Sequence, residues 1–186
     1  KHLKIDYKPS VRKAGGVYYT PTYIVNYIVQ NTVGKLIEGK TPKQISSLSF
    51  ADISCGSGSF LIGIFEYLIK YHTLYYNAHR DQAIKDRCHY DEDDKFYYLT
   101  IEQKKSILLN NIYGVDLDRQ ATIVAQMSLL LKLLENETFF TTSRGKGAQT
   151  TMMVADKILP NLSENIKSGN SLIGSDYTFQ TELNFN

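Results

Sequence analysis

The chain has 186 residues, of which 42% are hydrophobic and 22% charged, a composition typical of a globular domain with a core of its own. Its net charge of +2 does not by itself indicate a nucleic-acid partner. No apolar run approaches the roughly 18–20 residues that cross a bilayer, so we expect no membrane association. Two cysteines, Cys55 and Cys88, cannot form a disulfide framework and favour a reducing compartment.

The sequence does not predict a metal site, and it suggests a longer parent protein. Cys88 and His89 are adjacent and His79 lies upstream, without the paired spacing that zinc ligands use, so we expect no metal. The chain begins with Lys1 rather than Met, and we expect it to be part of something longer. Basic side chains outnumber acidic ones in the first thirteen residues, a charge run typical of a solvated arm.

Residues 20–39 are predicted to form the first helix. Thr20 suits the N-cap, Pro21 the first helical position and Gly39 the C-terminal stop. An apolar stripe at helical spacing supports this prediction: Ile24, Tyr27, Ile28, Val33, Leu36 and Ile37. We treat residues 1–47 as an N-terminal arm and helix that precede the main domain.

Residues 48–186 are predicted to form an α/β domain. A short strand, "LSFADI" at 48–53, leads through a glycine loop into a helix whose stripe is Phe60, Leu61, Ile64, Phe65, Leu68 and Ile69. The weakly periodic residues 71–108 are predicted to be a largely helical insertion. A second strand, "NIYGVDLD" at 111–118, ends in acidic residues.

The remainder continues the same alternation of strands and helices. A helical stripe follows the second strand: Ile123, Val124, Met127, Leu130, Leu131 and Leu134. A polar loop at 141–151 and a short strand at 165–167 come next. Strands alternating with helices predict a parallel sheet that holds its ligand at the carboxyl ends of the strands.

The glycine loop "ADISCGSGSFL" at 51–61 suggests a nucleotide, and two common types of nucleotide loop do not fit it. A P-loop requires GxxxxGK[ST], which the chain lacks. A dinucleotide fingerprint requires GxGxxG, but the position of the third glycine is Leu61. The ribose-binding acid of that fingerprint comes about 20 residues later, whereas Asp116 lies far downstream of Gly58.

S-adenosylmethionine fits the remaining pattern because it has no phosphate. It requires a glycine turn beside its amino-acid tail, acids for its ammonium and ribose groups, and an apolar slot with a polar edge for adenine. Asp52 can bind the ammonium, Asp116 the ribose, Leu117 the adenine face and Asn170 the adenine edge. Taken singly, Asp52 and Asp116 could each simply cap the helix that follows. The ordered set of residues favours the cofactor.

Four segments resemble N6-adenine DNA methyltransferases of type IIG restriction–modification and related bacterial phage-defence systems. They are "GVYYTP" (16–21), "ADISCGSGSFLIG" (51–63), "NNIYGVDLDRQATIVAQMSLLL" (110–131) and "LPNLSENIKSGNSLIG" (159–174). The family has a Tyr-Thr-Pro motif, a glycine loop, a strand ending in acid-hydrophobe-acid, and Gly-Asn-Ser-Leu, in this order. Ile53 stands where the family usually has proline, which should loosen the turn slightly.

The resemblance implies a partial Rossmann-like, S-adenosylmethionine-dependent methyltransferase fold with a helical N-terminal segment and a largely helical insertion. It also implies a set of cofactor-binding residues. The methionine end would be lined by Tyr19, Thr20 and Pro21. The tail-binding turn would comprise Asp52, Cys55, Gly56 and Gly58, with Phe60 beneath it. The adenosine would be held by Asp116 at the ribose, Leu117 and Leu172 on either side of adenine, and Asn170 at its amino group.

The resemblance implies catalytic groups that this sequence does not contain. The family acts through an Asn/Asp-Pro-Pro-Tyr/Phe motif that holds and stacks the flipped target adenine. The four prolines, at 9, 21, 42 and 160, include no Pro-Pro pair, so no catalytic residue is assigned. We expect the parent to methylate adenine N6 in double-stranded DNA in a prokaryotic cytoplasm. We expect this chain alone to be inactive and prone to self-association through uncovered sheet surface.

Two alternatives stay open at this stage. Methyltransferases with a similar motif act on protein glutamine or on RNA, and the residues that select the acceptor are not in this sequence. The chain could also be a non-catalytic, methyltransferase-like module that binds nucleic acid through its basic arm.

Overall fold

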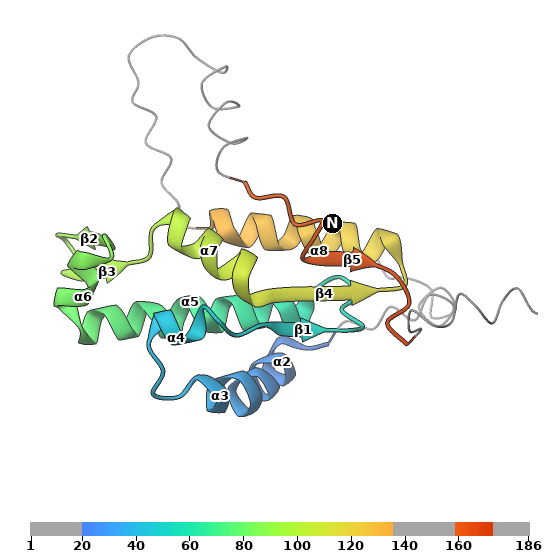
Figure 1. Ribbon diagram of the computed structural model, residues 1–186, viewed down its shortest axis with the longest axis horizontal. Coiled ribbons are helices and arrows are strands. Elements are labelled where there is room, and N and C mark those ends of the chain that lie inside the picture. The colour runs from blue at the N-terminus through green and yellow to red at the C-terminus, as the bar shows by residue number, and fades with distance from the viewer. Residues whose placement is uncertain (1–19, 136–158, 173–186) are drawn as a thin grey trace, which may run out of the picture.

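The computed structural model describes residues 20–135 and 159–172, and a small parallel sheet lies at its centre (Figure 1). The sheet has the order β1-β4-β5, with β1 at Phe50–Asp52, β4 at Ile112–Asp116 and β5 at Ile166–Ser168. Both pairings are parallel. The predicted mixed α/β class with a parallel sheet is therefore confirmed, and each of the three predicted strands is found within the predicted segment or one residue beyond it.

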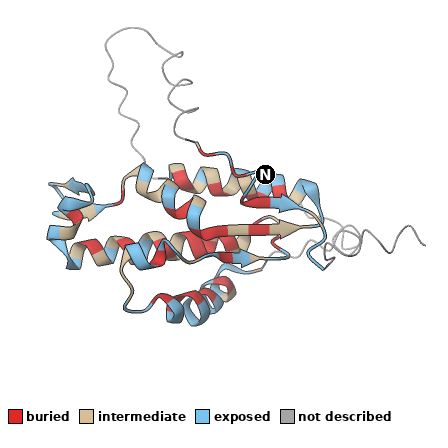
Figure 2. Ribbon diagram, in the orientation of Figure 1, coloured by how far each residue is buried: buried red, intermediate tan, exposed pale blue. Residues whose placement is uncertain are grey.

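Two long helices cover one face of this sheet. Helix α5 (Ser59–Ala78) follows β1, and α8 (Arg119–Leu134) follows β4. The two helices contact each other and both contact β4, so they lie on the same side. Lys132 on α8 forms ion pairs with Glu66 on α5 and with Glu135. Figure 2 shows buried positions gathered along β4 and the helices beside it.

The N-terminal helix is continuous but changes its winding part-way. It comprises α2 (Thr22–Val29), a π-helical segment η1 (Gln30–Gly34) and α3 (Lys35–Ile37), and then stops at Gly39 with φ of 72°. The predicted glycine stop is confirmed. The predicted cap is wrong: Pro21 occupies the N-cap position, without a side-chain hydrogen bond, and the helix begins at Thr22.

The buried face of this helix also differs from the predicted stripe. The buried residues are Val25, Val29, Val33 and Ile37, spaced by four, whereas Tyr27, Ile28 and Leu36 are exposed. In a regular α-helix, residues four apart differ by about 40° around the helix axis, so side chains spaced by four would not all point to the same side. The wider π turn offsets part of the drift and keeps the four side chains facing the core.

The N-terminal helix packs closely on α5 through both α2 and η1, and two glycines permit the approach. A Cβ added to Gly63 of α5 would lie 2.5 Å from Cγ1 of Val25. One added to Gly34 would lie 2.6 Å from the Tyr67 hydroxyl oxygen. The short helix α4 (Pro42–Ile45) follows, capped by Thr41 and Gln44 in a reciprocal capping box, and leads into β1.

The segment predicted as a largely helical insertion is helical with one unpredicted hairpin. Helix α5 extends to Ala78, followed by α6 (Arg80–Lys85), β2 (His89–Asp91), β3 (Phe96–Tyr98) and α7 (Ile101–Asn111). Strands β2 and β3 pair antiparallel, and the turn between them carries the acidic residues Glu92, Asp93 and Asp94. In Figure 1 this hairpin lies at the opposite end of the molecule from the carboxyl ends of β1, β4 and β5.

The predicted stripe of α5 is confirmed in its main residues, but that of α8 is wrong. In α5, Leu61, Ile64, Phe65 and Leu68 are buried. In α8 the buried residues are Thr122, Ala125, Leu129 and Leu133. Four apolar residues of the predicted stripe are instead exposed within the described part of the chain: Ile123, Val124, Met127 and Leu131. The inner face carries a small residue, Ala125, because Gly58 lies against it.

The core of α5 contains a histidine with an unusual environment. His72 is 5% exposed, and among the described residues its Nε2 has no hydrogen-bond partner. Burial lowers the pKa of His72 from 6.5 to about 4, because the imidazolium would lose its hydration. His72 is therefore neutral at physiological pH and part of the packing of the core.

This burial predicts acid sensitivity that one substitution should remove. The unfolded state binds a proton at His72 below pH 6.5, and the folded state does so only near pH 4. The free energy of unfolding should therefore be unaffected above pH 6.5 and fall below it, by about 2 kcal/mol at pH 5. In His72→Leu this contribution should be absent. Urea unfolding of the unmodified chain and of His72→Leu at pH 7 and pH 5 measures this contribution. An equal loss of unfolding free energy in the two proteins would contradict the assignment.

Candidate cofactor-binding site

The predicted site residues of the three strands meet at one edge of the sheet. The register pairs Asp52 of β1 with Gly114 of β4, and Asp116 of β4 with Ser168 of β5. The parallel strands therefore end side by side, and the segments that leave them lie along the same edge. This is the position at which open α/β sheets hold their ligands.

The glycine turn after β1 depends on backbone angles that favour glycine. Gly56 has φ of 52° and Gly58 has φ of 90°. A Cβ added to Gly58 would lie 3.0 Å from Cβ of Ala125, so this glycine also allows α8 to approach. A Cβ added to Gly56 would meet nothing within 4 Å. Gly56 thus borders open space at the edge of the sheet.

Hydrogen bonds fasten this turn to the end of β4. The Cys55 amide donates to the Val115 carbonyl oxygen at 2.9 Å, and the Gly56 amide donates to Oδ2 of Asp116 at 2.7 Å. Within the turn, the Gly58 amide donates to the Cys55 carbonyl oxygen at 2.8 Å. The Ser54 amide donates to Oδ1 of Asp52 at 3.1 Å. Four amides of this region are therefore engaged within the protein.

Cys55 is a packing residue in this turn and does not have a reactive thiol. Its side chain is buried. Burial, followed by the charges of Asp52 and Asp116, raises the pKa of the Cys55 thiol to about 11. The thiol is therefore protonated at neutral pH and cannot act as a nucleophile. Cys55 contributes its backbone to the turn and its side chain to the core.

Gly114 of β4 is a site residue that the sequence analysis did not identify. A Cβ at this position would lie 2.6 Å from Cδ1 of Leu61 and 3.0 Å from Sγ of Cys55. The missing side chain lets the glycine turn and the first turn of α5 pack directly on the strand. A glycine in the interior of a strand is the sequence signal that could have revealed this close approach.

Asp116 organises two loops at once. Its Oδ2 accepts from the Gly56 amide at 2.7 Å and its Oδ1 from the Asp118 amide at 2.8 Å. Asp118 is the N-cap of α8, accepting from the Gln120 amide at 2.8 Å. Asp116 is therefore not the cap of the helix that follows, and its carboxylate lies between the glycine turn and the end of β4.

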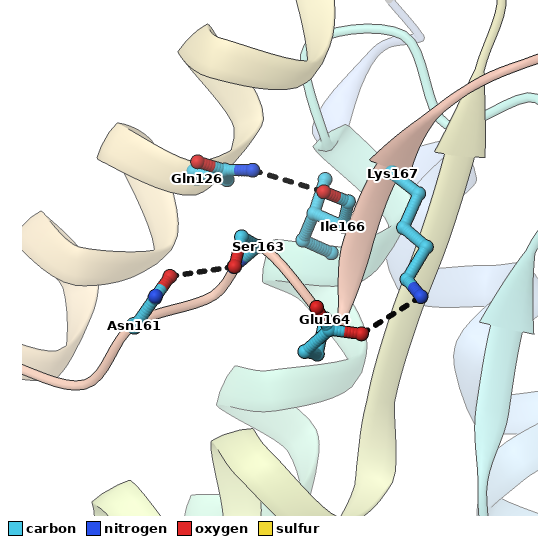
Figure 3. Close-up of polar contacts among 6 residues, drawn as sticks. All are labelled: Gln126, Asn161, Ser163, Glu164, Ile166 and Lys167. Atoms are coloured by element: carbon cyan, nitrogen blue, oxygen red, sulfur yellow. Dashed lines mark hydrogen bonds and ion pairs between the residues drawn. The ribbon is translucent and has the colours of Figure 1, made fainter.

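Strand β5 is held in place by side chains from its neighbours. Gln126 of α8 donates to the Ile166 carbonyl oxygen at 2.9 Å (Figure 3). The amide of buried Asn165 donates to the Leu109 and Ile112 carbonyl oxygens, both at 2.9 Å. On the outer side, Lys167 pairs with Glu164 at 2.9 Å (Figure 3). These contacts fix the point from which the turn at 169–172 leaves the sheet.

This turn carries the predicted adenine-binding residues. The Gly169 amide donates to the Asp116 carbonyl oxygen at 2.9 Å, which continues the pairing of the two strands. Oδ1 of Asn170 accepts from the Leu172 amide at 3.0 Å, so part of the capacity of Asn170 is used in its own turn. Leu172 is 87% exposed and Leu117 is 75% exposed. Two large apolar side chains thus stand open to solvent on segments that leave adjacent strands.

The other predicted site residues lie at the beginnings of α5 and α2 or outside the described residues. Phe60 is in the first turn of α5, partly buried against the core. Thr20 is half-buried and Pro21 exposed at the beginning of α2. Tyr19 lies outside the described residues. Among the residues that the structure describes, no group of three potential metal ligands comes together, and no helix is long and apolar enough to span a bilayer.

A model of the family described as N-6 DNA Methylase matches residues 5–184 of the chain. The chain belongs to this family. The predicted resemblance to N6-adenine DNA methyltransferases, which is based on four separate segments, is therefore confirmed over almost the whole sequence.

Two curated relatives of the chain are named as restriction enzyme and methyltransferase. The chain is 40% identical over 159 residues to the type II restriction enzyme and methyltransferase RM.Eco57I of Escherichia coli, covering 86% of the chain and 14% of the relative. It is 27% identical over 202 residues to the putative type II restriction enzyme and methyltransferase RM.MjaORFECS2P of Methanocaldococcus jannaschii, covering 88% of the chain and 15% of the relative. The chain thus spans about one seventh of the length of each relative.

The packing at Gly114 predicts a localised defect. Gly114→Ala places a methyl group against Leu61 and Cys55, so the glycine turn must shift or the strands must separate. We expect the free energy of unfolding to fall by about 1–3 kcal/mol, the usual cost of overpacking. Gly169→Ala is the matched control, because an added Cβ there meets nothing within 4 Å. Urea unfolding of both variants tests this, and equal stability of the two would contradict the packing argument.

Proposed function

We propose that this chain is the S-adenosylmethionine-binding part of a DNA methyltransferase that modifies adenine N6 in a restriction–modification system. The observation that carries the proposal is the convergence of the glycine turn, Asp116 and the turn at Asn170 on one edge of a parallel sheet. Family membership and the names of the two relatives support the reaction and the DNA substrate. We also propose that the sheet is part of a Rossmann-like methyltransferase domain.

The geometry of the turn suits a ligand without phosphate. A phosphate nest requires several neighbouring amides aimed at one point. Here the amides of Cys55, Gly56 and Gly58 already donate within the protein, and Gly56 leaves open space for a ligand to approach the backbone. An amino-acid tail with an ammonium group instead requires a carboxylate, and half-buried Asp52 lies at the start of the turn. This favours S-adenosylmethionine over a dinucleotide.

The adenosine half would be held by residues of β4 and β5. The carboxylate oxygens of Asp116 keep lone pairs beyond the two amide bonds they accept, and these can accept from ribose hydroxyl groups. Leu117 and Leu172 offer exposed apolar surface for the two faces of adenine. Asn170 lies two residues before Leu172, and the second lone pair of its Oδ1 would accept from the exocyclic amino group of adenine.

The groups present in the chain indicate which part of the reaction it can carry out. When bound, S-adenosylmethionine supplies an electrophilic methyl group, and the residues above would bind and orient it. The sequence contains no Pro-Pro pair and so no Asn-Pro-Pro-Tyr type motif to hold the target amine. We therefore propose that this chain binds the cofactor but does not transfer its methyl group unaided. Protein glutamine or RNA is the alternative methyl acceptor. The two relatives of the chain are named as restriction enzymes, and this favours DNA.

Calorimetric titration with S-adenosylmethionine, and in parallel with NAD, tests the cofactor. We expect heat only from S-adenosylmethionine. Leu117→Ala should weaken binding about tenfold without changing stability, because its side chain is exposed in the free protein and would become buried against adenine. Leu74→Ala is the matched control: Leu74 is also an exposed leucine, but it lies in the last turns of α5. Binding of NAD, or equal affinity in both variants, would overturn the site.

We further propose that the isolated chain self-associates. The exposed residues Ile123, Val124, Met127 and Leu131 form an apolar strip on α8 that nothing in the described part of the chain covers. Sedimentation velocity at rising concentration should show species larger than the monomer. Met127→Glu should shift the distribution toward monomer, because a charge would have to be buried in the contact. A concentration-independent monomer in the unmodified chain would reject this.

A further inference from the structure

Ser171 makes a long-range contact that none of the predicted roles uses. Its hydroxyl donates to the Ile53 carbonyl oxygen at 2.8 Å. Ile53 directly follows β1, and Ser171 lies beyond the end of β5. The sheet order places β4 between these strands, so β1 and β5 share no backbone pairing. This side-chain bond therefore connects two segments that the sheet itself keeps apart.

The bond completes a closed ring of hydrogen bonds around the edge of the sheet. The glycine turn after β1 is joined to β4 through Cys55 and Gly56, at 2.9 Å and 2.7 Å. The end of β4 is joined to the turn after β5 by the Gly169 amide and the Asp116 carbonyl oxygen at 2.9 Å. Ser171 then returns to the end of β1. Without the last bond the ring opens, and the turn at 169–172 is attached on one side only.

We propose that Ser171 is a positioning residue that sets the adenine pocket by holding Asn170 and Leu172 over the glycine turn. The proposal rests on the proposed function and assigns to Ser171 the orientation of its neighbours rather than a contact with the ligand. Asn170 and Leu172 flank Ser171 directly, and both are exposed, so core packing does not hold them. Their placement depends on the few hydrogen bonds of the turn.

The chemistry of the contact identifies the side chain to change. The acceptor is a backbone carbonyl, which any residue at position 53 would retain, including the proline usual in the family. The donor is the Ser171 hydroxyl, which alanine removes and threonine keeps. Loss of one such hydrogen bond should weaken a ligand that needs the fixed turn about five- to tenfold.

The experiment compares two ligands that differ only at the adenine edge. S-adenosylhomocysteine carries the exocyclic amino group, and S-inosylhomocysteine carries an oxo group in its place. In Ser171→Ala we expect five- to tenfold weaker binding of S-adenosylhomocysteine and a reduced preference for it over S-inosylhomocysteine. Ser171→Thr should restore both. Ser163→Ala, at an exposed serine of the segment before β5 (Figure 3), is the matched control and should bind as the unmodified chain does.

The outcomes separate this inference from the proposed function. If the unmodified chain binds neither ligand, the proposed function has failed. If it binds S-adenosylhomocysteine and Ser171→Ala binds it equally well, only the role of Ser171 is rejected. If Ser171→Ala binds S-adenosylhomocysteine and S-inosylhomocysteine more weakly by the same factor, positioning of the adenine edge is rejected. A general loosening of the pocket would weaken both ligands without changing the ratio of their affinities. Failure of Ser171→Thr to improve on Ser171→Ala would reject the hydroxyl as the cause.

Discussion

The edge of the sheet depends on the hydrogen bond from the Gly56 amide to the Asp116 carboxylate. It joins positions 60 residues apart and links the turn after β1 to the end of β4. A carboxylate that accepts two amides is a strong acceptor, and here the second amide belongs to Asp118 at the start of α8. One side chain thereby orders the glycine turn, the end of a strand and the entry to a helix.

Close packing around the glycine turn brings the Gly56 amide within hydrogen-bonding distance of the Asp116 carboxylate. The absence of side chains at Gly58 and Gly114 brings α8 and β4 within van der Waals contact of the turn. Cys55 fills the space that Gly114 leaves, and its buried, protonated thiol behaves as a small apolar group. The glycines of this region therefore serve two needs: Gly56 and Gly58 provide positive φ, and Gly58 and Gly114 provide room.

The fold leaves the predicted ligand groups on the outside of this framework. Leu117, Asn170 and Leu172 are exposed, whereas the residues that place them are bonded or buried. Rigid support beneath exposed binding groups is the arrangement that preorganised sites require. The hairpin of β2 and β3 lies at the opposite end of the molecule from this edge, so the hairpin is not part of the described site (Figure 1).

The sequence by itself determined the class of the fold, the positions of the three parallel strands along the chain, and the family. Local signals carried this information: the glycine loop, the acids after the second strand, and the glycine stop at Gly39. They act through backbone angles and short-range contacts, which are readable from neighbouring residues.

Only the tertiary structure decided which helix faces are buried and how the site is joined. Both faces of α8 offer apolar residues, and the small side chain of Ala125 was selected by its contact with Gly58. The π turn in the first helix places Val25 and Val29 on the buried face beside Val33 and Ile37 of the predicted stripe. It leaves Tyr27, Ile28 and Leu36 exposed. The roles of Gly114 and Ser171 likewise arise from partners 53 or more positions away, at Leu61 and Ile53. Contacts at such separations depend on the packing of whole elements, which no local pattern specifies.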